Sequence, residues 1–134
     1  MKQVFAAIVP VALALVVGAA SHESRASKEG KMVMTVLEAH VAQDRTGDLE
    51  RAYREGTSEL PTDIVETFLA RDTRDTTLFR IMTVWVSREA LEKMRASGVT
   101  PKGVQIFQTA GATPQLTVLD IVVRRIGQTA GKNH

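Results

Sequence analysis

One side chain in the body of the sequence is suited to acid–base chemistry, and it is His40. The other histidines, His22 and His134, stand near the two ends of the 134-residue chain. His40 lies on an otherwise apolar stretch, where an imidazole titrating near neutral pH could accept a substrate proton or orient a substrate oxygen. The competing interpretation is a half-buried histidine that hydrogen-bonds Glu38, Arg80 or the backbone and has a structural role.

Four further side chains are candidates for contacting a substrate. Glu38 precedes His40 by two positions, so the two share one face of an extended strand. Trp85 is the only tryptophan and could form a stacking wall for an aromatic ligand, although a tryptophan directly before a helix more often packs in the core. Arg80 could meet an anionic oxygen, but a cross-strand ion pair between Arg80 and Glu66 is the more common arrangement.

Composition and charge exclude several classes of function. The chain has no cysteine, which rules out disulfides, thiolate catalysis and cysteine-ligated metals, and its scattered histidines make a histidine metal site improbable. Residues 1–31 hold four of the 17 Lys/Arg and two of the 15 Asp/Glu, so the remainder is formally neutral. A nucleic-acid interface therefore has no electrostatic footprint.

Hydrophobic spacing and turn residues define the elements that must position these side chains. The expected elements are a strand at 32–42, a helix ending near 60, a hairpin with its turn at 72–77, a helix from 87 to 98, and a strand at 115–123. Residues 102–111 fit a short helix better than a strand. We therefore predict an α+β, ferredoxin-like βαββαβ fold with a four-stranded antiparallel sheet and both main helices on one face.

The second face of that sheet is also apolar. Phe68, Met82 and Val84 fall on it, and a surface of this kind is not left in water. The sequence therefore predicts a partner that covers it.

The first 31 residues lie outside the predicted domain, which spans residues 32–126, with residues 127–134 as a tail. An apolar run from Val4 to Ala20 follows Lys2 and precedes a polar stretch, which is the layout of a secretory signal peptide. A membrane anchor and a mis-set start, with Met32 or Met34 as the true first residue, are the alternatives. The protein is exported under the first interpretation and cytoplasmic under the third, and membrane contact is expected only if the leader is retained as an anchor.

The segment TVWVSREALEKMRASG, preceded by LERAYREGTSELP and IVETFLARD, resembles the antibiotic biosynthesis monooxygenase (ABM) family of dimeric α/β barrels. The resemblance covers about Met34 to Val123. Its most telling part is the apolar strand that ends at Trp85 and runs directly into a helix capped by Ser87.

This resemblance implies a homodimer in which two open sheet faces form a barrel, with a small pocket between each sheet and its own helices. It implies no cofactor and no metal, because in the oxygenases of the family the aromatic substrate supplies electrons to dioxygen. We therefore expect a monooxygenase acting on a small hydroquinone or phenol, with His40 as the catalytic residue. The alternative is a non-catalytic barrel that binds a small apolar ligand or has a structural role.

The haem-degrading members of that family are a poorer match. Their catalytic Trp and axial His correspond by spacing to about Met94 and Val104 here, and neither side chain can do the same work. The environment of His40 separates the remaining hypotheses: a ring lining the pocket favours an enzyme, and a ring sealed in the dimer interface favours binding or structure.

Overall fold

The chain divides into two units, residues 1–31 and 32–134, and the computed structural model describes residues 31–128. The leader interpretations concern residues outside this range. Within it, no helix has the length and apolar character needed to cross a membrane.

The described residues form four strands and four helical segments. In chain order they are β1 (Val33–His40), η1 (Gln43–Arg45), α2 (Thr46–Gly56), β2 (Ile64–Arg71), β3 (Leu78–Trp85), α3 (Arg88–Ala96), α4 (Lys102–Thr109) and β4 (Gln115–Asp120). The strands make one antiparallel sheet in the order β2-β3-β1-β4. The ferredoxin-like prediction is confirmed, as is the helical assignment of residues 102–111.

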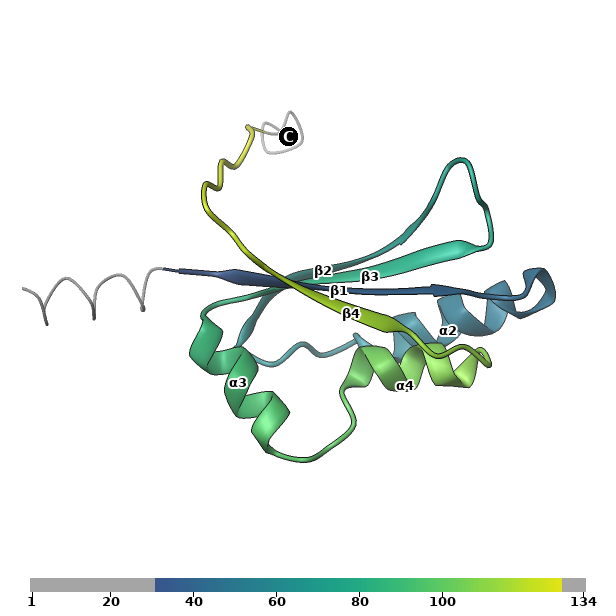
Figure 1. Cartoon of the computed structure of the whole chain (residues 1–134), viewed down its shortest axis with the longest axis horizontal. Helices are drawn as coiled ribbons and strands as arrows, with labels where there is room; N and C mark the ends of the chain where they lie inside the picture. The colour runs from purple at the N-terminus through teal and green to yellow at the C-terminus, as the bar shows by residue number, and fades with distance from the viewer. Residues whose placement is uncertain (1–30, 129–134) are drawn as a thin grey trace, which may run out of the picture. The chain divides into compact units, whose positions relative to one another are not determined.

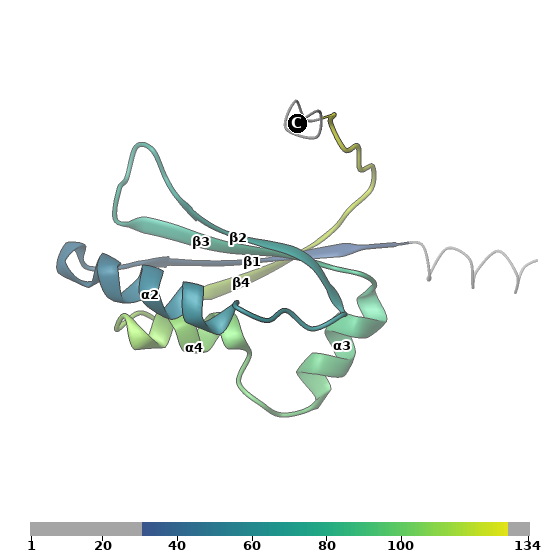
Figure 2. The same ribbon diagram turned by 180° about the vertical axis from the view of Figure 1, so that it is seen from behind.

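Helices α2, α3 and α4 all lie on the same face of the sheet (Figures 1 and 2). Side chains of β1 explain this choice, because Val33, Thr35, Leu37 and Ala39 alternate with more exposed residues and are buried against the helices. We call the other side of the sheet the open face.

The helix ends only partly follow the sequence prediction. Ser87 caps α3 as expected, since its Oγ accepts a hydrogen bond from the Ala90 amide at 3.1 Å. Helix α2 has no side-chain cap, and Thr46 instead donates its hydroxyl to the Gln43 carbonyl. It also ends at Gly56 rather than near Leu60.

The core forms two separate clusters beneath the sheet. Helices α2 and α4 pack with Leu37, Phe79 and Ile81, and the fully buried Leu49 and Phe107 come from these helices. Helix α3 packs on Val33 and Trp85, and Figure 1 shows this helix near the other end of the sheet from α2 and α4. Space is left between the two clusters.

The open face carries the apolar side chains expected from the sequence. Phe68 pairs in register with Met82, and Leu119 pairs with Met34, on this side of the sheet. Phe68 and Leu119 are 44% and 46% exposed. Strand β4 ends at Asp120, three residues before the predicted end, and Asp120 forms an ion pair with Arg88 of its own chain.

Candidate functional site

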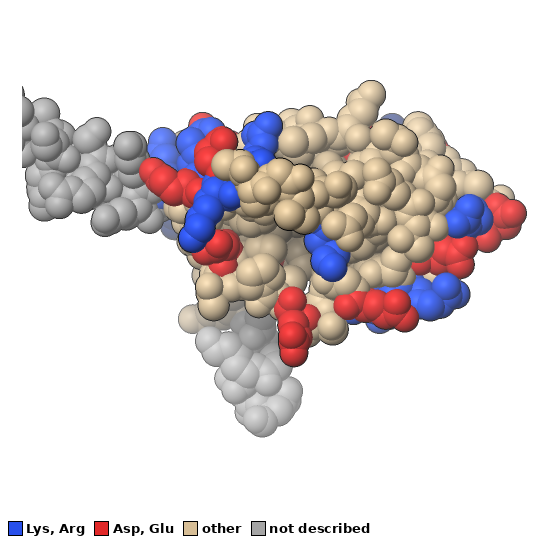
Figure 3. Space-filling view, turned by 90° about the horizontal axis from the view of Figure 1, so that it is seen from below, with Lys and Arg blue, Asp and Glu red and all other residues tan. Residues whose placement is uncertain are grey.

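A cavity of about 440 Å³ lies between the sheet and the helices, in the space between the two core clusters. Its walls are apolar and include Leu37, Ile81, Leu91, Ile106 and Leu116. Figure 3 views the domain from the helix side, where the surface is hollowed between charged side chains. The volume falls in the range of pockets that hold small organic ligands.

The floor of the cavity carries three threonines from three neighbouring strands. Thr67 of β2 pairs with Thr83 of β3, which pairs in turn with Thr35 of β1, and all three line the cavity. The Thr67 and Thr83 hydroxyl oxygens are 3.2 Å apart. We call these residues the threonine row.

Two larger side chains donate hydrogen bonds to this row. The Tyr53 hydroxyl of α2 donates to Thr67 Oγ1 at 3.2 Å, and the Trp85 indole N–H donates to Thr35 Oγ1 at 3.1 Å. Both donors also line the cavity. Tyr53 packs against the first core cluster while its hydroxyl reaches the floor.

Trp85 is the one predicted substrate residue that the structure places at the cavity. It is 8% exposed and packs with Val33, Ala90 and Leu91. Core packing and a cavity wall, which the sequence left as alternatives, are therefore combined in one side chain.

Charged side chains complete the lining. Glu59 and Asp63 precede β2, Arg95 belongs to α3, and Lys102 begins α4. Both signs of charge are thus available to a ligand in the cavity, whereas the threonine row is neutral.

His40, Glu38, Arg80 and Glu66 do not line this cavity. They fall on the open face. Leu37 and Ile81 form a buried pair that faces the helices, and the next pair along the strands, Glu38 and Arg80, points to the opposite side. The His40 side chain is 67% exposed, and its Nε2 lies 3.0 Å from Asp75 Oδ2 in the hairpin turn. The expectation of a half-buried His40 bonded to Glu38, Arg80 or the backbone is wrong, because the ring is exposed and contacts Asp75.

The predicted ion pair between Arg80 and Glu66 is also wrong. Arg80 contacts Glu38 at 2.6 Å and Asp72 at 3.5 Å. Glu66 lies opposite Val84 in the sheet and contacts Arg124 at 4.0 Å. In the β2–β3 register Arg80 lies opposite Ala70, four residues along the strand from Glu66, so the two charged side chains are not cross-strand neighbours.

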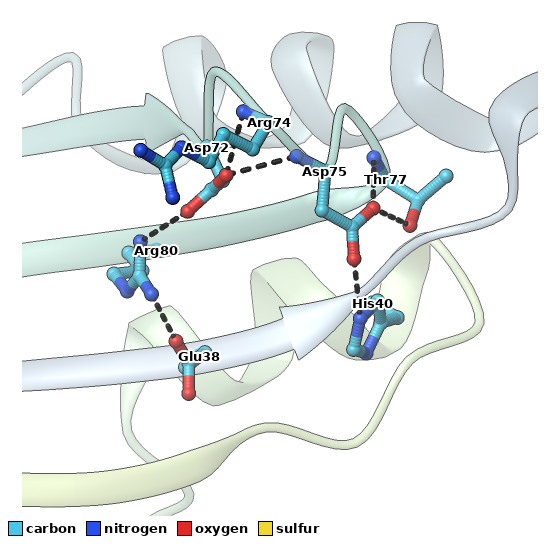
Figure 4. A network of polar contacts seen from close by, with 7 residues as sticks. All are labelled: Glu38, His40, Asp72, Arg74, Asp75, Thr77 and Arg80. Atoms are coloured by element: carbon cyan, nitrogen blue, oxygen red, sulfur yellow. Dashed lines mark hydrogen bonds and ion pairs between the residues drawn. The ribbon is translucent and has the colours of Figure 1, made fainter.

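The open-face polar groups form a network around the hairpin turn (Figure 4). Asp72 Oδ1 accepts the amides of Arg74 and Asp75 at 2.8 and 2.9 Å, and these bonds lower the pKa of Asp72. Asp75 accepts the hydroxyl and amide of Thr77, which together with His40 lower its pKa. The network therefore shapes a turn.

Sequence reasoning missed the threonine row, which is the main polar feature of the cavity. The available signal was strand parity, because Thr35 lies two residues from each of the inward residues Val33 and Leu37 and so shares their face of the strand. Alternation alone did not reveal that Thr67 and Thr83 would lie beside Thr35, since that depends on pairing between distant strands.

Within residues 31–128 there is no group of three or more histidine, cysteine, aspartate or glutamate side chains that could hold a metal ion. The charged side chains of the cavity come from separate elements, and the floor offers only hydroxyl and indole groups.

Several solved structures share this fold. A protein from Caulobacter crescentus CB15, provisionally assigned to the antibiotic biosynthesis monooxygenases, is 16% identical, with a TM-score of 0.56 over 76% of this chain and 100% of that one. A similarly assigned protein from Chloroflexus aurantiacus J-10-fl is 20% identical, with a TM-score of 0.51 over 72% and 99%. SnoaB, a cofactor-independent oxygenase from Streptomyces nogalater, is 15% identical, with a TM-score of 0.51 over 72% and 96%.

No protein-family model matches the sequence, and no curated protein matches it. The solved structures confirm the resemblance to the ABM family at the level of the fold.

Proposed function

We propose that this protein is a cofactor-independent monooxygenase that binds a small hydroquinone or phenol in the cavity between sheet and helices. The observation that carries the proposal is an apolar cavity with an aromatic wall at Trp85 and a hydroxyl floor. Such a lining suits a flat ring that bears oxygen atoms at its edge.

The reaction requires little of the protein. An electron-rich ring reduces dioxygen, one oxygen atom enters the ring and the other leaves as water, so that hydroquinone and dioxygen give a hydroxyquinone and water. The protein contributes by binding the ring, excluding solvent and favouring loss of the first proton. SnoaB, which has this fold, is named as a cofactor-independent oxygenase.

We propose a different residue as the one that takes the substrate proton. His40 lies on the opposite face of the sheet from the cavity. Glu59 and Asp63 are the two carboxylates among the cavity residues, and a carboxylate or a water molecule held by one can accept a proton. We propose this pair as the base, with Trp85 as the ring-binding wall.

We also propose that a second copy of the chain covers the open face. Phe68 and Leu119 are exposed there, together with Val122, Val123 and Ile126 of the segment that follows β4, which are 72–83% exposed. That segment leaves the sheet on the side away from the helices (Figure 1), and Arg124 contacts Glu66 there. An apolar surface of this extent favours association.

A non-catalytic protein that binds a small apolar ligand is the second candidate. The observation that favours it is the cavity floor itself, where Thr35, Thr67 and Thr83 supply hydroxyls and none can act as a base near neutral pH. The two candidates share a binding site and differ only in oxygen consumption.

Oxygen uptake by the full chain with a panel of hydroquinones and phenols tests the proposal. We expect uptake that persists in a metal chelator and is lost in Leu116→Trp, because Leu116 lines the cavity on the edge strand and is 47% exposed. Val99→Trp is the matched control, since Val99 is 66% exposed in a loop and does not line the cavity. Binding without uptake would favour the second candidate.

A further inference from the structure

Two hydroxyl protons of the threonine row have no acceptor among the hydrogen bonds of the described residues. A threonine hydroxyl offers one proton and two lone pairs, and a tyrosine hydroxyl or an indole offers one proton. The bonds at the row determine which protons are already used.

Thr35 keeps its proton. Its oxygen accepts the N–H of Trp85 at 3.1 Å, and among the bonds of the described residues none has the Thr35 hydroxyl as donor. Thr35 is 8% exposed and lines the cavity, so the acceptor for this proton has to come from inside the cavity.

The second free proton belongs to the group formed by Tyr53, Thr67 and Thr83. These three hydroxyls have three protons, and their two contacts, from Tyr53 to Thr67 and between the threonines, use two. Whichever threonine donates in the second contact, the other keeps a proton free. When Thr67 is the donor in the second contact, the free proton is that of Thr83. Thr83 stands directly opposite Thr35 in the β1–β3 register, so the two free protons are then on neighbouring residues.

We infer that Thr35 and Thr83 form a two-donor site that binds the oxygen of a phenolate whose ring lies against Trp85. The Thr35 hydroxyl accepts a bond from Trp85, and the Thr83 hydroxyl accepts one in the order in which Thr67 is the donor. Such chains strengthen the donor at their end. Neither threonine can lose its proton near neutral pH, so the site favours an anionic oxygen over a neutral hydroxyl, which would compete as a donor.

This inference rests on the proposed function for the identity of the substrate, but its test does not require turnover. The probe is 4-nitrophenol, whose phenolate form has its own visible absorbance. Its pKa is titrated free and bound to the full wild-type chain. We expect the bound pKa to be lower, with phenolate favoured by about tenfold for each donating hydroxyl.

Variants locate the effect. Thr35→Val and Thr83→Val should each return the bound pKa toward the free value, whereas Thr35→Ser, which keeps the hydroxyl, should retain the shift. Thr117→Val is the matched control, because Thr117 lies on β4 in register with Val36, away from the cavity. Leu116→Trp should abolish binding and so place the probe in the cavity.

The titration of the probe bound to the wild-type chain tests the two-donor site even if a variant fails to fold. A bound pKa equal to or above the free value, or no binding of the probe, overturns the inference. A lowered pKa that both valine variants retain overturns it as well. A lowered bound pKa without oxygen uptake supports the two-donor site and contradicts the proposed monooxygenase activity. Oxygen uptake without a lowered bound pKa supports the monooxygenase activity and contradicts the two-donor site.

Discussion

The indole N–H of Trp85 and the hydroxyl of Thr35 are joined by a hydrogen bond of 3.1 Å that runs diagonally between β3 and β1. It links the aromatic wall of the cavity to its polar floor. One substitution on either side should therefore affect folding and ligand binding together.

Replacing Thr35 with valine should lower the free energy of unfolding. The change leaves the Trp85 N–H without its partner in a site that is almost fully buried, and an unpaired buried donor costs about 1–3 kcal/mol. Urea denaturation followed by tryptophan fluorescence measures the loss. Thr35→Ser should lose less, and equal stability of the valine variant and wild type would contradict the pairing.

Replacing His40 with alanine should leave oxygen uptake within about twofold of wild type, since most surface substitutions away from a site have small effects. The ring lies on the open face, bonded to Asp75. Initial rates for His40→Ala and Asp63→Asn make the comparison. A large loss only in His40→Ala would return His40 to the mechanism.

Acid should weaken the hairpin turn through Asp75. Hydrogen bonds from Thr77 and His40 lower its pKa below the ordinary value of 3.8, so its contribution to stability is present above about pH 4 and is lost as the pH falls through the lower folded value. Asp75→Asn should therefore be less stable than wild type at neutral pH and should show a weaker pH dependence below about pH 4. Urea denaturation at a series of pH values tests this, and parallel curves would contradict it.

The proposed dimer can be tested with two leucines of one strand. Leu119 faces the open side and Leu116 faces the cavity, with nearly equal exposures of 46% and 47%. Leu119→Arg should reduce the mass in light scattering to that of one chain, because a charge would be buried at the interface. Leu116→Arg should leave the mass unchanged. A wild-type mass of one chain would contradict the dimer.

The fold followed from patterns that are local in the sequence. The alternation in β1, the Asp- and Thr-rich turn and the Ser87 cap each act over a few residues, and together they define the order of elements. The site depended on information of a different kind. Thr35, Thr67 and Thr83 meet only because of the register in which β3 pairs with β1 and β2, and no local pattern specifies that register.

The position of His40 illustrates the same limit. The alternation of side chains along a strand correctly placed His40 on the same face as Glu38 and on the face opposite to Leu37. Because Met34 and Val36 make the second face of β1 apolar as well, parity did not decide which face the helices would cover. The packing of α2 and α4 on Leu37 made that choice.

Gly103 shows how the size of the cavity is limited. A Cβ on this residue would stand 2.6 Å from Leu37 Cδ1, so α4 rests its backbone on a side chain that also forms the cavity wall. Any larger residue at position 103 would have to displace the Leu37 side chain and so alter the cavity wall. The close approach of α4 to the sheet beside the cavity therefore depends on the absence of a single methyl group at this position.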